Sequence, residues 1–302
     1  MRHYNGPKRE KFVHKLIAEL TAAGPVLTDG AWGTQLQAQG LEVGACPDAW
    51  NLAQPDRVEA VARAYVEAGS RIILTNTFGA NRLTLARYGL AGRVAEINRA
   101  GVEISRRAAG GKARVFASVG PTGVMLLTGE TPPDDVRAAF AEQIEALAAA
   151  GADAVVLETF SDPAEVVLAI EAARPTGLPV VASMVFDSGK DHDRTLMGTT
   201  PEQAARQLTE AGADCIGSNC GQGIEGFVAI TRRLRAATDR PLWIKPNAGL
   251  PEVVGGKTVY AQTPQQFAAV VPALVKAGAA FVGCCCGTTP QFIAAVRETL
   301  TR

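Results

Sequence analysis

The feature that most constrains the fold of this chain is a short segment that occurs four times. Each copy begins with Ala-Gly, at residues 68–69, 150–151, 211–212 and 277–278, and continues with an apolar run and then with polar residues. A glycine after a helical stretch is typical of a helix end. A short run of Val, Ile and Ala without polar alternation is typical of a strand that is buried on both faces. The repeat therefore predicts helices that lead into the strands of a parallel sheet.

Four more candidate strands precede or separate these copies, at residues 25–29, 115–119, 179–184 and 242–245. The segments between the strands are rich in alanine and have a helical pattern. Three of them begin with a capping residue, a proline, and Glu or Gln three positions after the cap; the caps are Asp162, Thr200 and Thr263. Eight alternating strand and helix units over 302 residues predict an α/β fold, a (β/α)8 TIM barrel. A doubly wound open sheet is the alternative.

The chain has no linker rich in Pro, Gly and Ser, so we expect a single domain. Residues 11–20 have apolar side chains at helical spacing. We interpret residues 1–24 as an N-terminal lead-in helix that packs outside the main fold, and residues 25–302 as the barrel.

Charge and composition exclude several classes of protein. The 30 Lys and Arg residues balance the 30 Asp and Glu residues, and no basic run occurs, so we expect no nucleic-acid partner. No apolar stretch approaches the roughly 20 residues of a membrane helix, and no apolar segment follows the basic N-terminus as in a signal peptide. The six cysteines are clustered rather than spaced as a disulfide framework, which favours a reducing cytoplasm. The sequence is compatible with a homo-oligomer but does not indicate one.

Polar residues gather at the ends of the predicted strands, which is where a TIM barrel carries its site. They include Asp29, Asn76, Glu158, Asn219, Cys220, Lys245, Cys285 and Cys286. Only one strand separates the sixth strand from the eighth. We therefore expect Cys220 to meet Cys285 and Cys286 across the mouth of the barrel.

Three thiolates with one open position are typical of a catalytic zinc site rather than a structural one. The open position suits a substrate thiol, because a metal lowers the thiol's pKa. Hydrolytic zinc sites more often use histidines, and this chain has only three. The pattern thus favours alkyl transfer to sulfur. We interpret Cys215 as a small buried hydrophobe and Cys46 as a loop thiol without a role.

Residues 283–290, Gly-Cys-Cys-Cys-Gly-Thr-Thr-Pro, resemble the Gly-Gly-Cys-Cys-Gly-Thr-x-Pro signature of the homocysteine S-methyltransferase family. Residues 29–34, 75–78, 158–159 and 217–220 match the other blocks of that family in order, so the resemblance covers about residues 25–295. It implies a (β/α)8 barrel, Zn²⁺ bound by Cys220, Cys285 and Cys286, and homocysteine as the methyl acceptor. It further implies that Asp29, next to Gly30, and Glu158 hold the amino group of homocysteine. Asn76 and Asn219 are candidates to position the substrate or the ligand loops.

One position departs from the family pattern, because Cys284 stands where the signature has its second glycine. We expect Cys284 to point into the barrel wall as a small apolar residue. The alternative is that it replaces one of its neighbours in the metal site.

The resulting hypothesis is a zinc-dependent transfer of a methyl group from an onium donor to homocysteine, which gives methionine. An onium donor should meet aromatic faces, for which Trp32, Trp50, Phe78 and Phe160 are candidates. Betaine is disfavoured because the positions that line its site in related enzymes fall near Cys46, Ala80 and Thr159. We therefore favour S-methylmethionine or S-adenosylmethionine. The alternatives are a methyl-corrinoid protein as donor, another thiol as acceptor, and a non-catalytic zinc or redox-sensing barrel.

Overall fold

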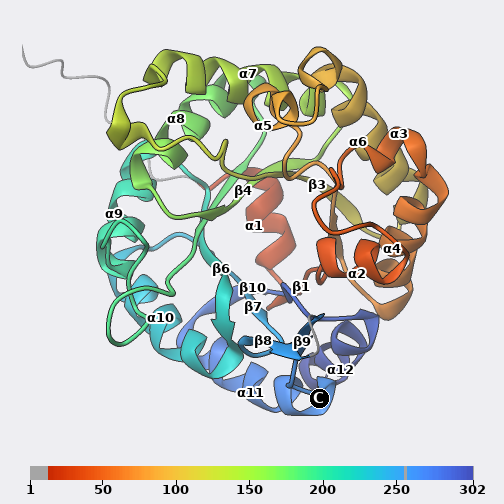
Figure 1. Cartoon of the computed structure of the whole chain (residues 1–302). Coiled ribbons are helices and arrows are strands. Elements are labelled where there is room, and N and C mark those ends of the chain that lie inside the picture. Colours follow the sequence, from red (N-terminus) through yellow and green to blue (C-terminus); the bar gives the residue numbers. More distant parts are fainter. Residues whose placement is uncertain (1–12, 255–256, 302) are drawn as a thin grey trace, which may run out of the picture.

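The computed structural model describes residues 13–254 and 257–301. Eight parallel strands form one sheet that curls into a nearly closed barrel with helices around it (Figure 1). Their bounds are β1 Val26–Leu27, β2 Ile72–Leu74, β3 Arg114–Val119, β4 Ala154–Phe160, β5 Val180–Met184, β6 Cys215–Gly223, β7 Leu242–Asn247 and β10 Ala279–Val282. The predicted TIM barrel is confirmed.

The order of the strands rules out the doubly wound alternative. Going round the sheet, the order is β2-β3-β4-β5-β6-β7-β10-β1, so each strand pairs with the next barrel strand along the chain. The two edge strands meet through the Arg71 amide, which donates to the Leu27 carbonyl at 2.9 Å. The Ser70 hydroxyl adds a second contact by donating to the Thr28 carbonyl at 3.2 Å.

Within the described residues, seven longer helices each connect one barrel strand to the next, and an eighth follows the last strand. They are α4 Pro55–Ala68, α6 Val94–Ala109, α7 Pro133–Ala149, α8 Pro163–Ala173, α9 Pro201–Ala211, α10 Ile224–Ala237, α11 Pro264–Ala277 and α12 Pro290–Leu300. Shorter helices are α1 Lys15–Thr21, α2 Gly33–Ala38, α3 Trp50–Ala53 and α5 Arg82–Ala86, with single 3-10 turns at Ala91–Arg93, Leu126–Thr128 and Arg174–Thr176. Within the described residues, no helix is both long enough and apolar enough to cross a membrane.

The three predicted helix caps are present, but one of them differs in detail. Thr200 and Thr263 each form the full reciprocal capping box with the Gln three residues later. Asp162 caps α8 by accepting from the Ala164 amide. Glu165 does not complete that box, because its carboxylate accepts instead from the Thr122 amide at 2.7 Å and the Thr122 hydroxyl at 2.6 Å. A contact from another loop thus outcompetes the local one.

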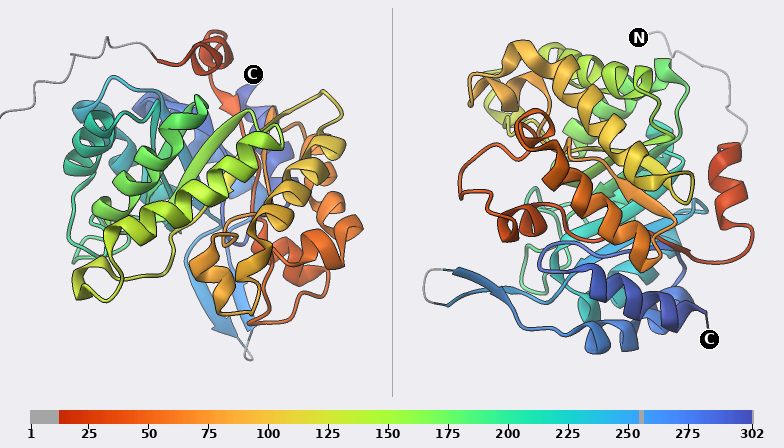
Figure 2. Two further views of the ribbon diagram at one scale, coloured as in Figure 1. Left: turned by 90° about the horizontal axis from the view of Figure 1, so that it is seen from above. Right: turned by 90° about the vertical axis from the view of Figure 1, so that its right-hand side faces the viewer.

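The N-terminal end of the barrel is filled by aromatic rings and closed by α1. Trp243 lies between Phe116 and Phe281, with ring centroids 6.0 and 5.3 Å away. Ile17 and Leu20 of α1 belong to the same buried cluster. The helix lies at the barrel's centre in Figure 1 and outside one end in Figure 2. The described helix begins at Lys15, and residues 1–12 of the predicted lead-in segment lie outside the described part, so the division at residue 24 stays a prediction.

Side chains two or four positions after these aromatic residues also face the barrel interior, because strand side chains alternate between the two faces of the sheet. Ser118 follows Phe116, Lys245 follows Trp243, and Cys285 comes four positions after Phe281. Cys284 falls on the opposite face and is fully buried among the apolar residues between sheet and helices. The expected wall position of Cys284 is therefore observed.

A two-stranded antiparallel hairpin, which the sequence pattern does not indicate, lies between β7 and α11. Its strands are β8 Pro251–Val254 and β9 Lys257–Tyr260. The hairpin and α1 lie at opposite ends of the barrel (Figure 2). The hairpin places Tyr260 at the thiol cluster, since a β-carbon on Gly287 would lie 2.1 Å from the Tyr260 ring. Gly287 also has φ +79°, so glycine is required there on both grounds.

Candidate active site

The C-terminal end of the barrel holds a cavity of about 560 Å³. Its wall includes residues from the ends of β2, β3, β4, β6, β7 and the segment after β10. Among the predicted site residues, Gly30, Asn76, Glu158 and the three cysteines Cys220, Cys285 and Cys286 line it. Asp29 and Asn219 are buried behind the wall.

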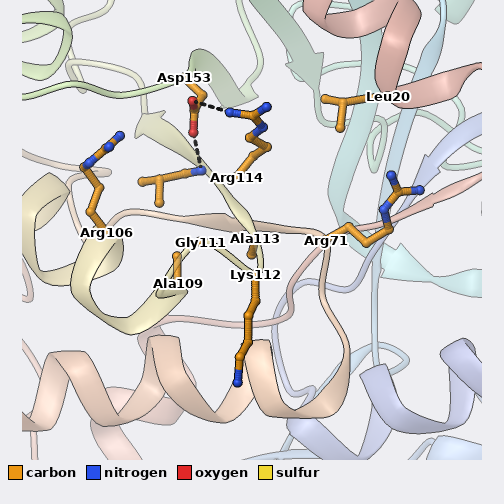
Figure 3. Close-up of a pocket in the computed structure, with 10 residues that line it drawn as sticks. Leu20, Arg71, Arg106, Ala109, Gly111, Lys112, Ala113, Arg114 and Asp153 are labelled. Carbon is orange, nitrogen blue, oxygen red and sulfur yellow. Dashed lines mark hydrogen bonds and ion pairs between the residues drawn. The ribbon is translucent and has the colours of Figure 1, made fainter.

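A second cavity of about 420 Å³ lies toward the N-terminal end and is lined by Arg71, Arg106, Lys112, Arg114 and Asp153 (Figure 3). Its cations do not converge. Arg114 pairs with Asp153 at 3.4 Å, Arg106 donates to the Gly151 carbonyl at 2.6 Å, and the Lys112 side chain points away from the others in Figure 3. We therefore place the candidate active site at the C-terminal end.

The three predicted thiols meet at the mouth of the barrel. The ligand atoms of Cys220, Cys285 and Cys286 all lie within 4.8 Å of one another, and the sulfurs of Cys220 and Cys286 are 3.8 Å apart. Cys220 has φ +63°, a left-handed conformation that non-glycine residues rarely adopt. Strained backbone of this kind concentrates at functional sites. Cys284 is not part of the cluster.

The cluster favours one thiolate shared among three sulfurs. Hydrogen bonds from Cys285 and Cys286 lower the pKa of Cys220 despite its burial. The same contact with Cys220 raises the pKa of Cys285 and of Cys286. Asn219 adds its Nδ2 atom at 3.9 Å from the Cys285 sulfur.

The residues present fit a thiophilic metal ion such as Zn²⁺. Three soft sulfur donors lie close together, each only partly buried. The Asn247 side chain contacts the Cys220 sulfur, and its Oδ1 atom is buried without a hydrogen-bond partner. An unpaired acceptor beside three thiols is compatible with a bound cation.

The two predicted carboxylates differ in their surroundings. Glu158 lines the cavity and accepts from the Ser118 hydroxyl at 2.5 Å. Burial raises the Glu158 pKa, although the charge of Lys245 opposes the shift. Asp29 already has three partners within the protein: Lys245 Nζ at 2.6 Å, Trp32 Nε1 at 2.8 Å and the Leu74 amide at 2.7 Å. A direct contact between Asp29 and substrate stays a prediction.

The two asparagines are fixed by contacts to loops. Asn219 accepts from the Thr159 amide at 2.9 Å and donates to the Thr159 hydroxyl at 2.7 Å, which holds Thr159 at φ +66°. Asn76 donates to the Pro47 carbonyl at 2.8 Å and to the Asn51 side chain at 3.0 Å. Both therefore order loops around the cavity.

Sequence reasoning missed two residues of the wall, Lys245 and Asp48. Lys245 was noted only as a strand end, and nothing in its neighbourhood along the chain indicates a partner 216 residues away. Asp48 lies in the loop before α3, where no motif of the sequence indicates a role. It is 3% exposed, lines the cavity, and accepts from the Gly79 amide at 3.0 Å.

Burial raises the pKa of Asp48 from 3.8 to about 6. Between these values the native state holds a proton that the unfolded chain has lost, so stability falls as the pH rises through this window, by at most about 3 kcal/mol. We expect Asp48→Asn to remove this loss. The free energy of unfolding of both proteins is measured in urea at pH 4 and pH 7.5. Relative to the parent protein, the variant should be more stable at pH 7.5 than at pH 4. A relative stability that changes in the opposite direction would contradict the assignment.

The geometry defines a class of protein, a (β/α)8 barrel with three clustered thiols and a buried glutamate at its mouth. The sequence model of the homocysteine S-methyltransferase family matches residues 26–300. The chain belongs to the homocysteine S-methyltransferase family.

Individual relatives agree with this assignment. The chain is 32% identical to a methionine synthase of Mycobacterium leprae over 95% of its own length, and 33% identical to a methionine synthase of Mycobacterium tuberculosis over 88%. It spans about a quarter of the length of these relatives, 25% and 24%. A crystal structure of the Escherichia coli homocysteine methyltransferase MmuM in its metallated form is 26% identical and superposes with a TM-score of 0.75, covering 91% of this chain and 96% of that one.

Proposed function

We propose that this protein is a zinc-dependent thiol S-methyltransferase that moves a methyl group from an onium donor to homocysteine and gives methionine. S-methylmethionine and S-adenosylmethionine are the favoured donors. The observation that carries the proposal is the cluster of Cys220, Cys285 and Cys286 on the wall of a cavity that Glu158 also lines. Family membership supports the choice of acceptor.

Each group in the cavity has a role that its surroundings support. Cys220, Cys285 and Cys286 would hold the ion, and Glu158 would accept from the substrate ammonium. Bound Zn²⁺ would lower the pKa of the substrate thiol so that it is a thiolate at neutral pH. In the transfer, the bond between the methyl carbon and the onium atom breaks, and a new carbon–sulfur bond forms. The leaving group takes the electron pair, and the thiol proton goes to solvent.

The charges on the cavity wall support a cationic donor. Asp48 and Glu158 contribute carboxylates. Of the cations on the wall, Lys245 is paired with Asp29, and Arg87 donates to the Thr122 and Gly123 carbonyls at 3.2 and 3.0 Å. Because Asp29 offsets the charge of Lys245, the two wall carboxylates outweigh the one remaining wall cation, Arg87, and favour a positively charged ligand.

Two of the four aromatic candidates lie where a donor could meet them. Trp32 and Phe78 line the cavity. Phe160 is fully buried against Phe140, with ring centroids 5.9 Å apart, so its expected donor contact is not available. Trp50 is not part of the wall and instead carries Arg57 over its ring at 5.4 Å.

Glu158→Gln keeps the size of the side chain but removes its charge. We expect the KM for homocysteine to rise about 10- to 100-fold, because the ammonium loses a charge-assisted hydrogen bond. Zinc content should not change, since Glu158 is not a thiol ligand. Steady-state kinetics with homocysteine varied, together with metal analysis, checks this. An unchanged KM would remove Glu158 from substrate binding.

A donor screen tests the proposed function. The zinc-loaded protein is incubated with homocysteine and, in turn, S-methylmethionine, S-adenosylmethionine, betaine or methylcobalamin, and methionine is measured by mass spectrometry. We expect methionine with a sulfonium donor. Competition between homocysteine and other thiols identifies the acceptor. No methionine with any donor, with metal content responding to oxidant, would favour a redox-sensing barrel.

A methyl-corrinoid protein is the second candidate donor, and exposed apolar side chains favour it. Within the described residues, the exposed large hydrophobic side chains all lie in connections that follow the C-terminal ends of barrel strands. They are Val43, Phe78, Tyr88, Met125, Leu127, Leu196, Met197, Leu250 and Val259. Such a rim suits a macromolecular donor better than a small one. Methionine formation from methylcobalamin but not from sulfonium donors would decide for it.

A further inference from the structure

Lys245 is a buried cation with unused hydrogen-bonding capacity. Its side chain is 2% exposed, and its ammonium donates to Asp29 Oδ1 at 2.6 Å. An ammonium group has three N–H donors. Within the described residues, Asp29 is its single hydrogen-bond acceptor, and its other contact is a cation–π contact with Trp243, whose ring centroid lies 5.9 Å from Nζ. Buried donors without partners are rare because each one loses its hydration without compensation.

The position of Lys245 places these free donors beside the thiol cluster. β7 pairs with β6 on one side, which carries Cys220, and with β10 on the other, which leads to Cys285. Lys245 is in register with Asn219, the residue before Cys220. Lys245 and Glu158 both line the cavity that contains the three cysteines.

A purely structural ion pair would not explain this arrangement. Asp29 accepts from three donors, whereas Lys245 donates to one carboxylate oxygen and otherwise contacts only the face of the Trp243 ring within the described residues. Burial by itself would lower the pKa of Lys245, but the charges of Asp29 and Glu158 outweigh it and raise the pKa, so the ammonium is charged. The asymmetry indicates that Asp29 holds a charged ammonium in place for another anion.

We infer that Lys245 binds the α-carboxylate of the methyl acceptor, while Glu158 binds its ammonium and the thiol cluster receives its sulfur. This inference rests on the proposed function, and it restricts the acceptor to thiols that are α-amino acids. Lys245 is thus a specificity-determining residue. Asp29 acts on the substrate through Lys245, as a positioning residue.

The test compares homocysteine with 3-aminopropane-1-thiol, which has the same amine and thiol but no carboxylate. Binding of each to the zinc-loaded protein is measured by isothermal titration calorimetry without any donor. We expect the parent protein to bind homocysteine about 10- to 100-fold more tightly, because one ligand completes the charged hydrogen bonds of Lys245 and the other does not.

Two variants isolate the role of Lys245. Lys245→Met removes the ammonium, and the double variant Lys245→Met, Asp29→Asn also removes the carboxylate that would otherwise stay buried without its partner. We expect the double variant to fold and to bind zinc. Its affinities for homocysteine and for 3-aminopropane-1-thiol should differ by no more than about threefold. Glu158→Gln is the matched control: it should weaken both thiols alike and keep the preference.

The outcomes separate this inference from the proposed function. A double variant that binds zinc and still prefers homocysteine as strongly as the parent protein overturns the role of Lys245, even if methyl transfer is observed. Loss of the preference supports that role even if no donor gives methionine. If the parent protein shows no preference for homocysteine, the inference is overturned as well.

Discussion

Replacing Cys220 or Cys286 by alanine should abolish zinc binding and methyl transfer together. The sulfurs of these residues are 3.8 Å apart in one cluster with Cys285, so either substitution leaves only two thiols. We expect zinc affinity to fall by more than the roughly 10- to 100-fold that loss of an outer hydrogen-bond partner costs. Metal analysis after dialysis and the methionine assay measure both effects on the same sample.

Cys284→Ala is the matched control for this experiment. The side chain is fully buried outside the cluster, so the variant should keep its zinc and its activity. Loss of zinc in Cys284→Ala with retention in Cys286→Ala would mean that the two cysteines exchange roles. Full activity of a metal-free protein would overturn the proposed zinc chemistry.

Gly283→Ala should damage the site while leaving all three thiols in the chain. A β-carbon at residue 283 would lie 1.9 Å from Thr28 Oγ1 and 2.8 Å from the Asp29 carbonyl oxygen. Overpacking of this kind costs about 1–3 kcal/mol. Because the Cys284 amide donates to that same Asp29 carbonyl at 2.9 Å, the segment that carries Cys285 and Cys286 must shift. We expect lower stability and weaker zinc binding.

Gly92→Ala provides the comparison, since no atom lies within 4 Å of a β-carbon there. Thermal unfolding and zinc titration of both variants measure the effects. Equal zinc affinity in Gly283→Ala and the parent protein would show that close packing at β10 does not position the thiols.

The fold could be predicted from the sequence because its signals are local and repeated. The Ala-Gly copies recur before every second barrel strand, capping residues begin several of the helices, and each βα unit packs against its neighbours along the chain. Glu165 shows where this reasoning ends: its spacing from Asp162 predicts a capping box, but Thr122 is a better partner in three dimensions. The hairpin β8–β9 was missed because it lies inside a βα connection, outside the repeated pattern.

The three metal-ligand candidates were also predictable: barrel order brings Cys220 to the segment after β10, and the family signature indicates Cys285 and Cys286. Strand alternation alone would have placed Cys286 on the side of Cys284, but the chain turns at Cys286 and Gly287. The pairing of the charged side chains in the site could not be predicted from the sequence. Asp29 and Lys245 are 216 residues apart and meet only because β1, β10 and β7 are neighbours in the closed sheet. Asp48 likewise reaches the cavity through its contact with Gly79 on another loop.

The sequence by itself determined where the eight barrel strands lie along the chain and which end of the barrel carries the site. These follow from periodicity and chain direction, which are local properties. Only the tertiary structure decided which charges pair. Ion pairing in a buried site depends on distance, so Asp29 pairs with Lys245, whereas Glu158 on the cavity wall accepts from the neutral Ser118 hydroxyl.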